Sequence, residues 1–356
     1  MIKMDKNHIV TEDIKNIIDS IKESIRQLED KTIIITGGTG FLGQYIVSTL
    51  AKLNKDHLRK NCKIISIDNN IVTNKKSLFK RIKDKNIIYI RHDVSKYLKI
   101  KSNVDYIIHA AGIAAPVFYQ KYPLETIDVA ITGTRNMLEL ARKKRAKSFL
   151  FFSSSEIYGN PAIDAIPTKE TYKGNVSCIG PRACYDESKR MGETLCLTYF
   201  RMFNTPIKIV RPFNIFGPGM NLKDYRVIPN FLNSALSNKP IPVHASGKQT
   251  RTFSYISDAI SAFFKVFLSS TNGEVYNVGN DKDEITMNQL AQIINKIFNN
   301  KLKINNIEYP KKYPADEPQR RCPDLTKIKK ELAFKNRVNL EDGLRRTIMW
   351  CKENWI

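Results

Sequence analysis

Near the start of the chain a short β-rich run passes directly into a glycine-rich turn, and this junction strongly restricts the possible fold. Residues 31–36 (KTIIIT) form the run, GGTGFLG follows at 37–43, and apolar residues recur at helical spacing from Tyr45 to Leu53. A strand, a glycine turn and a helix in this order are typical of a dinucleotide-binding βαβ unit, because the glycines permit close approach of the backbone to a pyrophosphate. The residues expected at the cofactor are Gly37, Gly40, Phe41, Leu42 and Gly43.

Further β-rich segments follow along the chain, and helical stretches separate most of them. They lie at 63–67, 86–90, 104–109, 147–153, 207–210 and 275–278. Strands that alternate with helices predict an α/β protein with a Rossmann-type, doubly wound parallel sheet.

Polar or small residues follow three of these strands at the edge where such sheets bind ligands. Asp68 can accept hydrogen bonds from both hydroxyls of an adenosine ribose and would repel a 2′-phosphate, which favours NAD over NADP. Asp93 and Val94 follow the next strand, where an adenine amino group could be recognised. The small residues Ala110, Ala111 and Gly112 leave room for the cofactor backbone.

Tyr185 and Lys189 are four residues apart, so a helix would place both side chains on one face. A phenol releases its proton near pH ~10, and a neighbouring ammonium should lower that pKa toward the range of a useful general base. The strand at 147–153 leads into Ser154, Ser155 and Glu156. The serine hydroxyls can donate to a sugar oxygen, and a glutamate at an apolar strand end is costly without a partner or a function.

These motifs resemble the extended short-chain dehydrogenase/reductase family, in particular its nucleotide-sugar branch and, within it, the UDP-glucuronate decarboxylases. The resemblance runs from about residue 31 to the C-terminus. It is carried by GPRACYDE at 180–187, RPFNIFGP at 211–218, QTRTF at 249–253, QRRCPD at 319–324 and LEDGL at 340–344.

The resemblance implies specific roles. Tyr185 would be the base, and Lys189 would lower its pKa and bond the nicotinamide ribose. Ser154 and Ser155 would lie beside the sugar, Glu156 would match the decarboxylase glutamate, and Arg321 would meet the sugar carboxylate or assist proton delivery. The residues expected to bind the nucleotide sugar are Tyr119, Asn214, Val227, Arg251 and Arg321.

The reaction implied is decarboxylation of UDP-glucuronate to UDP-xylose through a 4-keto intermediate, with NAD recycled in each turnover. Two other reactions of the branch stay open. An NDP-hexose 4,6-dehydratase would need an acid beside Glu156, where this chain has Ser155, and a 4-epimerase would leave Glu156 and Arg321 without a special task. A degenerate NAD-binding regulatory protein is the alternative outside enzymes, although Ser154, Tyr185 and Lys189 are all present.

The length of 356 residues suggests two closely packed lobes. We expect an N-terminal helical extension (1–30), an NAD-binding domain (31–212 with about 252–280) and a smaller nucleotide-sugar lobe (213–251 and 281–356). Within the extension, an apolar stripe at 12–29 predicts a helix with Thr11 as its N-cap. The segments 221–226 and 311–318 are expected to be loops that order around the substrate.

The net charge of +23 is interpreted as a lysine-rich solvated surface, because the basic clusters lack interleaved aromatic residues and no specific nucleic-acid partner is expected. The six scattered cysteines predict neither a metal site nor disulfides. No long uncharged apolar run and no signal peptide are recognised, so we expect a cytoplasmic protein without a membrane anchor. The resemblance implies a homodimer built on helices at 126–144 and 185–203.

Overall fold

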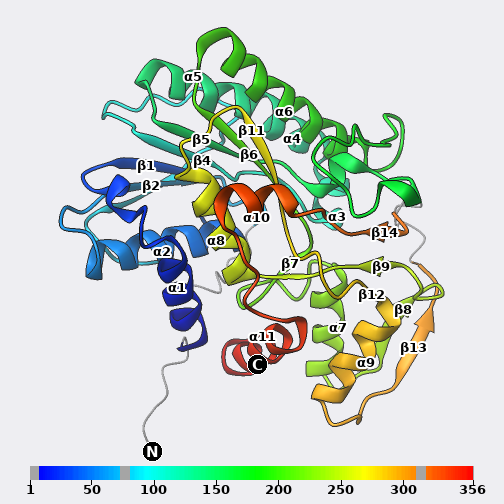
Figure 1. Cartoon of the computed structure of the whole chain (residues 1–356). Helices are drawn as coiled ribbons and strands as arrows, with labels where there is room; N and C mark the ends of the chain where they lie inside the picture. Colours follow the sequence, from blue (N-terminus) through cyan, green and yellow to red (C-terminus); the bar gives the residue numbers. More distant parts are fainter. Residues whose placement is uncertain (1–7, 73–80, 310–317, 356) are drawn as a thin grey trace, which may run out of the picture.

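The computed structural model describes residues 8–72, 81–309 and 318–355 (Figure 1). Its central sheet has the strand order β11-β6-β5-β4-β1-β2-β3, and every neighbouring pair is parallel. This arrangement confirms the Rossmann-type sheet. The strands are β1 (Thr32–Thr36), β2 (Lys63–Asp68), β3 (Ile87–Arg91), β4 (Tyr106–His109), β5 (Ser148–Phe152), β6 (Ile207–Pro212) and β11 (Glu274–Val278).

Helices cover both faces of this sheet because its buried strands carry apolar side chains on both sides. In β1, Ile33 and Ile35 belong to one core cluster, whereas Ile34 points into the other. The first face carries α1 (His8–Ile21), α2 (Phe41–Asp56) and α8 (Ile256–Phe267) (Figure 1). The second carries α4 (Pro123–Asp128), a π-helical turn (Val129–Gly133), α5 (Thr134–Lys144) and α6 (Ala183–Phe203).

The N-terminal helix differs from its prediction at both ends. It covers His8–Ile21, and a separate 3₁₀ turn at Ile25–Leu28 follows it. Thr11 therefore lies inside the helix, and its assignment as the N-cap is wrong. The apolar stripe extends toward the N-terminus through Ile9 and Val10, whose burial against the main body favours the longer helix.

The second part of the chain forms smaller sheets beside the carboxyl edge of the main sheet (Figure 1). The segment 311–318, expected to be a substrate loop, lies outside the described residues except for Pro318. Within the range expected for the smaller lobe, α10 (Thr326–Leu332) packs against β11 of the main sheet, where Lys327 donates to the carbonyl of Val275 across 2.9 Å.

The other elements of the described residues are short or lie in the second part of the chain. They are α3 (Pro116–Lys121), 3₁₀ turns η3 (Ser155–Tyr158) and η4 (Ile163–Ala165), β7 (Ile215–Phe216), α7 (Val227–Leu236), β8 (Ile241–His244), β9 (Thr250–Arg251), β10 (Ser254–Tyr255), β12 (Ile285–Thr286), α9 (Met287–Ile297), β13 (Ile304–Ile307), β14 (Arg320–Arg321) and α11 (Leu340–Asn354).

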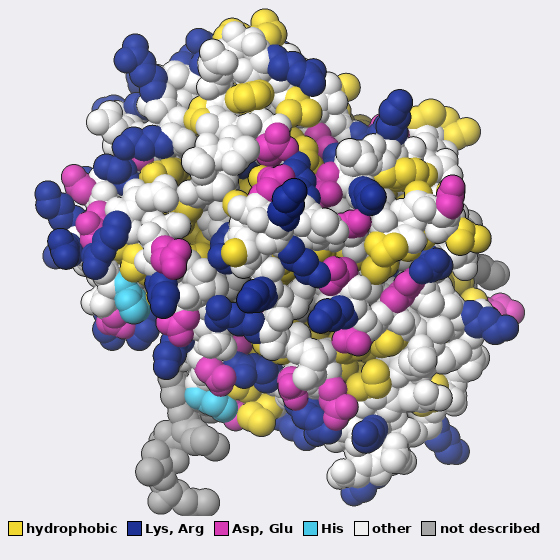
Figure 2. Space-filling view, viewed as in Figure 1, with side chains coloured by type: hydrophobic (Ala, Val, Ile, Leu, Met, Phe, Trp, Pro, Cys, Tyr) yellow, Lys and Arg dark blue, Asp and Glu magenta, His cyan; other side chains and the backbone are white. Residues whose placement is uncertain are grey.

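Figure 2 shows lysine and arginine side chains spread over one face of the molecule, with aspartate and glutamate between them. No helix within the described ranges is long and apolar enough to cross a membrane. Each of the six cysteines lies in the described part and forms no disulfide.

Candidate active site

The glycine turn lies between the end of β1 and the start of α2, and its glycines are needed for steric reasons. Gly37 has φ +71°, and a Cβ atom there would lie 2.7 Å from the carbonyl oxygen of Ala110. A Cβ at Gly43 would collide with the backbone of Gly37, so only glycine lets α2 approach the turn this closely. The turn therefore leaves open the space that a pyrophosphate at the N-terminus of α2 would require.

The residues expected at the cofactor lie together along the carboxyl edge of the sheet. Asp68 is tied to the turn, because its carboxylate accepts hydrogen bonds from the backbone N–H groups of Thr39 (3.1 Å) and Asn70 (2.8 Å). Asp93 accepts from the backbone and the hydroxyl of Ser95. One cleft is lined by Gly37, Gly40, Asp68, Asp93, Val94, Ala110, Ala111 and Gly112, and an adjoining cleft also contains Phe41, Leu42 and Gly43.

Lys189 belongs to α6, and its side chain is buried where this helix packs against the end of β5. Its Nζ donates to the carbonyl of Phe152 across 2.7 Å, and a Cβ at Gly112 would lie 3.2 Å from the same Nζ. Burial lowers the pKa of Lys189 to about 8, since the charged ammonium loses hydration there. The ammonium thus lies directly beside the small residues at the end of β4, where the sequence places the cofactor.

Tyr185 lies on the same helix, and the Nζ of Lys189 is 5.9 Å from its ring centroid. Burial raises the pKa of Tyr185, while a hydrogen bond with Ser154 lowers it in part. The net direction is opposite to that expected from the neighbouring lysine, because desolvation of the phenolate outweighs the favourable charges around it. Tyr119 stacks on the Tyr185 ring, with centroids 5.4 Å apart and planes 14° from parallel, and so fixes its orientation.

Glu156 lies in η3, directly after the two serines. The hydroxyl of Ser154 accepts from the backbone N–H of Glu156 across 3.2 Å and caps the turn, and Ser155 is buried. The carboxylate of Glu156 forms ion pairs with two buried arginines, Arg182 and Arg321. Both arginines contact the same carboxylate, so this glutamate at the end of an apolar strand has charged partners that offset the cost of its burial.

Arg182 is a site residue that sequence analysis missed. It immediately precedes α6, its Nε lies 3.5 Å from an oxygen of Asp186, and its Nη2 bonds Glu156. Its spacing to Tyr185 indicates the position, because residues three apart at the start of a helix lie on the same face of that helix.

A cavity beside these groups contains the residues expected to bind the substrate. Its described walls include Tyr119, Glu156, Arg182, Asn214, Arg226, Val227, Arg251 and Arg321. Arg226, also missed from the sequence, is paired with Asp224 across 2.9 Å, and its positive charge lowers the pKa of Tyr185 in part.

Arg251 and Asn214 also have structural contacts in this wall. Arg251 donates to the carbonyls of Pro318 (2.6 Å) and Gln319 (3.2 Å), and thereby holds the strand that carries Arg321. Asn214 donates to the carbonyl of Thr252 across 2.9 Å. No cluster of three His, Cys, Asp or Glu side chains that could hold a metal ion occurs in residues 8–72, 81–309 and 318–355.

The sequence pattern of the NAD dependent epimerase/dehydratase family matches residues 33–279. The chain belongs to this family. UDP-glucuronic acid decarboxylase 5 of Arabidopsis thaliana is 39% identical over 312 residues, which are 88% of this chain and 86% of that protein. UDP-glucuronic acid decarboxylase 1 of Xenopus tropicalis is 34% identical over 357 residues, covering 96% of this chain and 80% of that protein.

Solved structures of other proteins share the fold. Epimerase Mth375 from Methanothermobacter thermautotrophicus has a TM-score of 0.81 at 24% identity, covering 95% of this chain and 97% of that one. DesIV, a dTDP-glucose 4,6-dehydratase from Streptomyces venezuelae with NAD and TYD bound, has a TM-score of 0.77 at 22% identity, with coverage of 91% and 97%. NAD is the cofactor of the family, and the glycine turn, Asp68 and the small residues after β4 fit a bound dinucleotide.

Proposed function

We propose that the chain removes carbon dioxide from UDP-glucuronate and forms UDP-xylose, with NAD regenerated in each turnover. The observation that carries this proposal is the position of Glu156 between Arg182 and Arg321 in the wall of one cavity. The decarboxylases that are 34–39% identical to the chain support the same reaction.

The charges around the cavity support an anionic sugar nucleotide. Four arginines and one carboxylate, that of Glu156, are among the described residues that line it. UDP-glucuronate carries negative charge on its diphosphate and on its sugar carboxylate, so its charge is complementary to this excess of guanidinium groups. A nucleotide with a neutral sugar would carry only the two charges of its diphosphate and would lack the charge of the sugar carboxylate.

The residues around Tyr185 are suited to the first step. The chemistry that NAD supplies when bound is reversible acceptance of a hydride from C4 of the sugar. Tyr185 acts in its phenolate form, which the hydrogen bond from Ser154 and the charges of Arg226 and Arg182 stabilise against the cost of burial, and takes the proton of the C4 hydroxyl. Ser154 holds the same sugar oxygen in place. Tyr119 keeps the phenol ring aligned, and Lys189 lies between the cofactor cleft and the base.

The arginine pair is suited to the second step. Once C4 is a ketone, the carboxylate on C5 is β to it, so the C5–C6 bond can break with its electron pair moving into an enolate. The hydroxyls of Ser154 and Tyr185 stabilise the enolate oxygen, and C5 then takes a proton from water. Tyr185 returns its proton to the C4 oxygen as the hydride goes back to C4, which gives UDP-xylose. Arg321 orients the departing carboxylate, while Glu156 fixes the guanidinium groups of Arg182 and Arg321.

The experiment that tests this proposal is mass spectrometry of the products formed from a panel of UDP, dTDP, GDP and CDP sugars. Loss of carbon dioxide from UDP-glucuronate, with UDP-xylose as product, is the expected result. A dehydrated hexose from any substrate would identify a 4,6-dehydratase, and an epimer would identify a 4-epimerase. No turnover of any sugar would support an NAD-binding regulatory protein.

We also propose a cytoplasmic homodimer. Exposed apolar side chains on α4 and α6, which pack against each other, provide a surface for a second copy: Leu124, Met191, Met202 and Phe203. The free cysteines fit a reducing compartment. Light scattering on the wild type and on Leu124→Asp should give a dimer and a monomer, respectively. A monomeric wild type would contradict the proposed assembly.

A further inference from the structure

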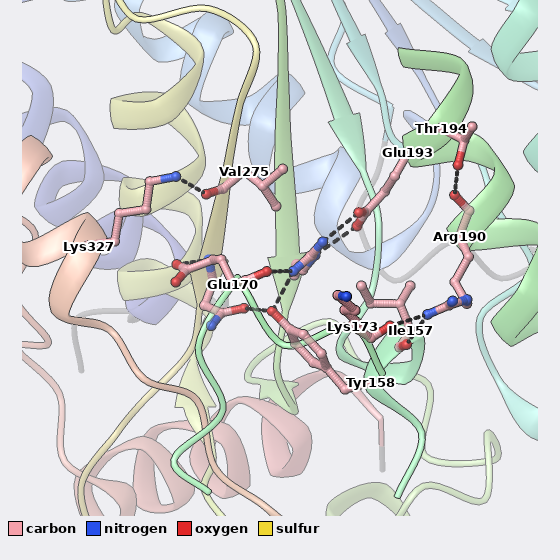
Figure 3. Close-up of polar contacts among 11 residues, drawn as sticks. Ile157, Tyr158, Glu170, Lys173, Arg190, Glu193, Thr194, Val275 and Lys327 are labelled. Carbon is pink, nitrogen blue, oxygen red and sulfur yellow. Dashed lines mark hydrogen bonds and ion pairs between the residues drawn. The ribbon is translucent and has the colours of Figure 1, made fainter. Parts of the chain in front are cut away.

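Behind the site, Arg211 of β6 forms a buried bidentate ion pair with Glu193 of α6. Its Nε donates to one carboxylate oxygen across 2.9 Å and its Nη2 to the other across 2.6 Å (Figure 3). Both side chains are at least nine-tenths buried. The described walls of the substrate cavity include neither residue, so the pair acts on any reaction through other groups.

The third nitrogen of the same guanidinium extends the pair toward η3. Nη1 of Arg211 donates to the hydroxyl of Tyr158 across 2.7 Å and to the carbonyl of Glu170 across 2.9 Å (Figure 3). The hydroxyl of Tyr158 donates in turn to the side-chain oxygen of Asn277 in β11 across 2.7 Å. Asn277 is fully buried and donates to the carbonyl of Thr168. Directly or through Tyr158, Arg211 of β6 is thus linked to α6, to β11, to the 3₁₀ turn η3 and to the loop that contains Thr168 and Glu170.

The two ends of this network lie next to the two halves of the site. Glu193 is one helical turn beyond Lys189, and Tyr158 is two residues beyond Glu156 in the same 3₁₀ turn. Arg190 of α6 also bonds η3 directly, by donating to the carbonyl of Ile157 across 3.2 Å. Because a bidentate guanidinium fixes both distance and angle, Arg211 adds a second, more rigid constraint on how far η3 lies from α6.

We propose that Arg211 is a positioning residue that holds the turn bearing Glu156 in register with the helix bearing Tyr185 and Lys189. The proposal rests on the proposed function, because it concerns the alignment of oxidation at C4 with loss of the carboxylate at C5. A buried ion pair contributes little net stability compared with apolar residues of the same size. The fixed geometry is what Arg211 adds, and a displacement of about 1 Å at a reacting group can cost about 10²-fold in rate.

The same chain offers a matched control on the same strand. Lys208 is also a buried cation of β6, but it lies three residues earlier and donates to Ser148 and Asn272. Its neighbours do not contact the site described above, so Lys208→Met tests the effect of losing a buried cation from β6 without moving η3.

The test compares Arg211→Lys, Tyr158→Phe and Lys208→Met with the wild type. Arg211→Lys keeps the charge and loses the bidentate geometry. Tyr158→Phe keeps the Arg211–Glu193 pair and removes only the hydrogen bond from Arg211 to η3. For each variant the measurements are the melting temperature, the dissociation constant of NAD by calorimetry, KM, kcat, and the fraction of turnovers that release a 4-keto sugar.

We expect Arg211→Lys and Tyr158→Phe to lower kcat by about 10- to 10²-fold and to raise release of the 4-keto sugar, because the two steps are no longer aligned. Their NAD affinity and KM should stay within about threefold of the wild type. Lys208→Met should lower the melting temperature and leave kcat and the product ratio unchanged. The proposal is overturned if Arg211→Lys and Tyr158→Phe lose no more kcat than Lys208→Met. A wild type that releases no carbon dioxide from UDP-glucuronate would overturn the proposed function as well.

Discussion

Arg321 donates from its Nη2 to an oxygen of Glu156 across 2.8 Å, although 165 positions of sequence separate the two residues. The contact joins η3, at the end of the main sheet, to β14. The backbone of β14 runs parallel to β9, with Arg321 opposite Arg251 in the strand register. The contact between Arg321 and Glu156 closes one wall of the cavity with a carboxylate and a guanidinium in direct contact. This relationship is the basis of the predictions on the reaction.

Replacing Tyr185 with phenylalanine should abolish turnover and leave NAD binding intact. The change removes only the hydroxyl that would take the C4 proton, and loss of a general base costs about 10²- to 10⁴-fold in rate. Stacking on Tyr119 does not depend on the hydroxyl, so the site should keep its shape. Steady-state kinetics and calorimetry with NAD are the measurements, and a rate near that of the wild type would refute the assignment of the base.

Glu156→Gln should impair the loss of carbon dioxide more than the initial oxidation. The amide keeps the size of the side chain but removes the charge that holds Arg182 and Arg321, so the arginines lose their common anchor. Mass spectrometry should detect a 4-keto sugar that still carries its carboxylate. Glu284→Gln is the matched control, since Glu284 pairs with the neighbouring Arg320 instead of Arg321. An unchanged product profile in Glu156→Gln would remove this residue from the mechanism.

Asp68 should make the protein prefer NAD over NADP. Its carboxylate lies in the cofactor cleft and would repel the 2′-phosphate of NADP. Asp68→Ala should therefore reduce the ratio of NAD affinity to NADP affinity by about 10-fold or more. Calorimetric titration with each dinucleotide measures that ratio. Asp84→Asn, outside this cleft, should leave it unchanged. Equal affinities of the wild type for NAD and NADP would contradict the reading of Asp68.

Stability should depend on pH through Asp13, the buried carboxyl of α1. Burial raises the pKa of Asp13 from 3.8 to about 6, and the charge of Arg346 and hydrogen bonds from Tyr255, Arg346 and Tyr45 offset this only in part. Because the folded protein binds this proton more tightly than the unfolded chain, the contribution to the free energy of unfolding is full below pH about 4. It is lost as the pH rises to about 6, and the change amounts to about 3 kcal/mol.

Urea unfolding of the wild type and of Asp13→Asn across this range measures the effect, since the variant has no titrating group at the position. The free energy of unfolding of the wild type minus that of Asp13→Asn should fall as the pH rises through about 4 to 6 and then level off. Glu12→Gln is the control, because Glu12 bonds the same Arg346 from an exposed position. A difference between wild type and Asp13→Asn that does not change with pH would contradict the raised pKa.

The seven strands of the main sheet could be predicted from the sequence because each is a short β-rich run, and turns or helical stretches separate most of them. The same pattern predicts that the glycine turn, Asp68, Asp93 and Ala110 lie at one edge of the sheet, and a single cleft is lined by all of them. The helix before β1 was expected, but its first residue was not, because burial of Ile9 and Val10 outweighs the capping preference of Thr11.

Other features of the site depend on residues that are distant in sequence. The pKa of Tyr185 is raised although Lys189 lies on the same face of the helix, because local spacing does not reveal how completely the phenol is buried. Helical spacing places Arg182 near the face of Tyr185, but its contact with Glu156, 26 positions earlier, forms only in the folded chain.

The parallel sheet, the dinucleotide turn and the placement of Tyr185 and Lys189 on one helix face all follow from local properties of the chain, namely strand periodicity, glycine sterics and helical spacing. Three features arise only when the chain folds: Glu156 lies between two arginines, Arg211 connects η3 to α6, and burial raises the pKa of Tyr185. Electrostatic interactions act through space and depend on desolvation, so they are settled only when distant segments pack together.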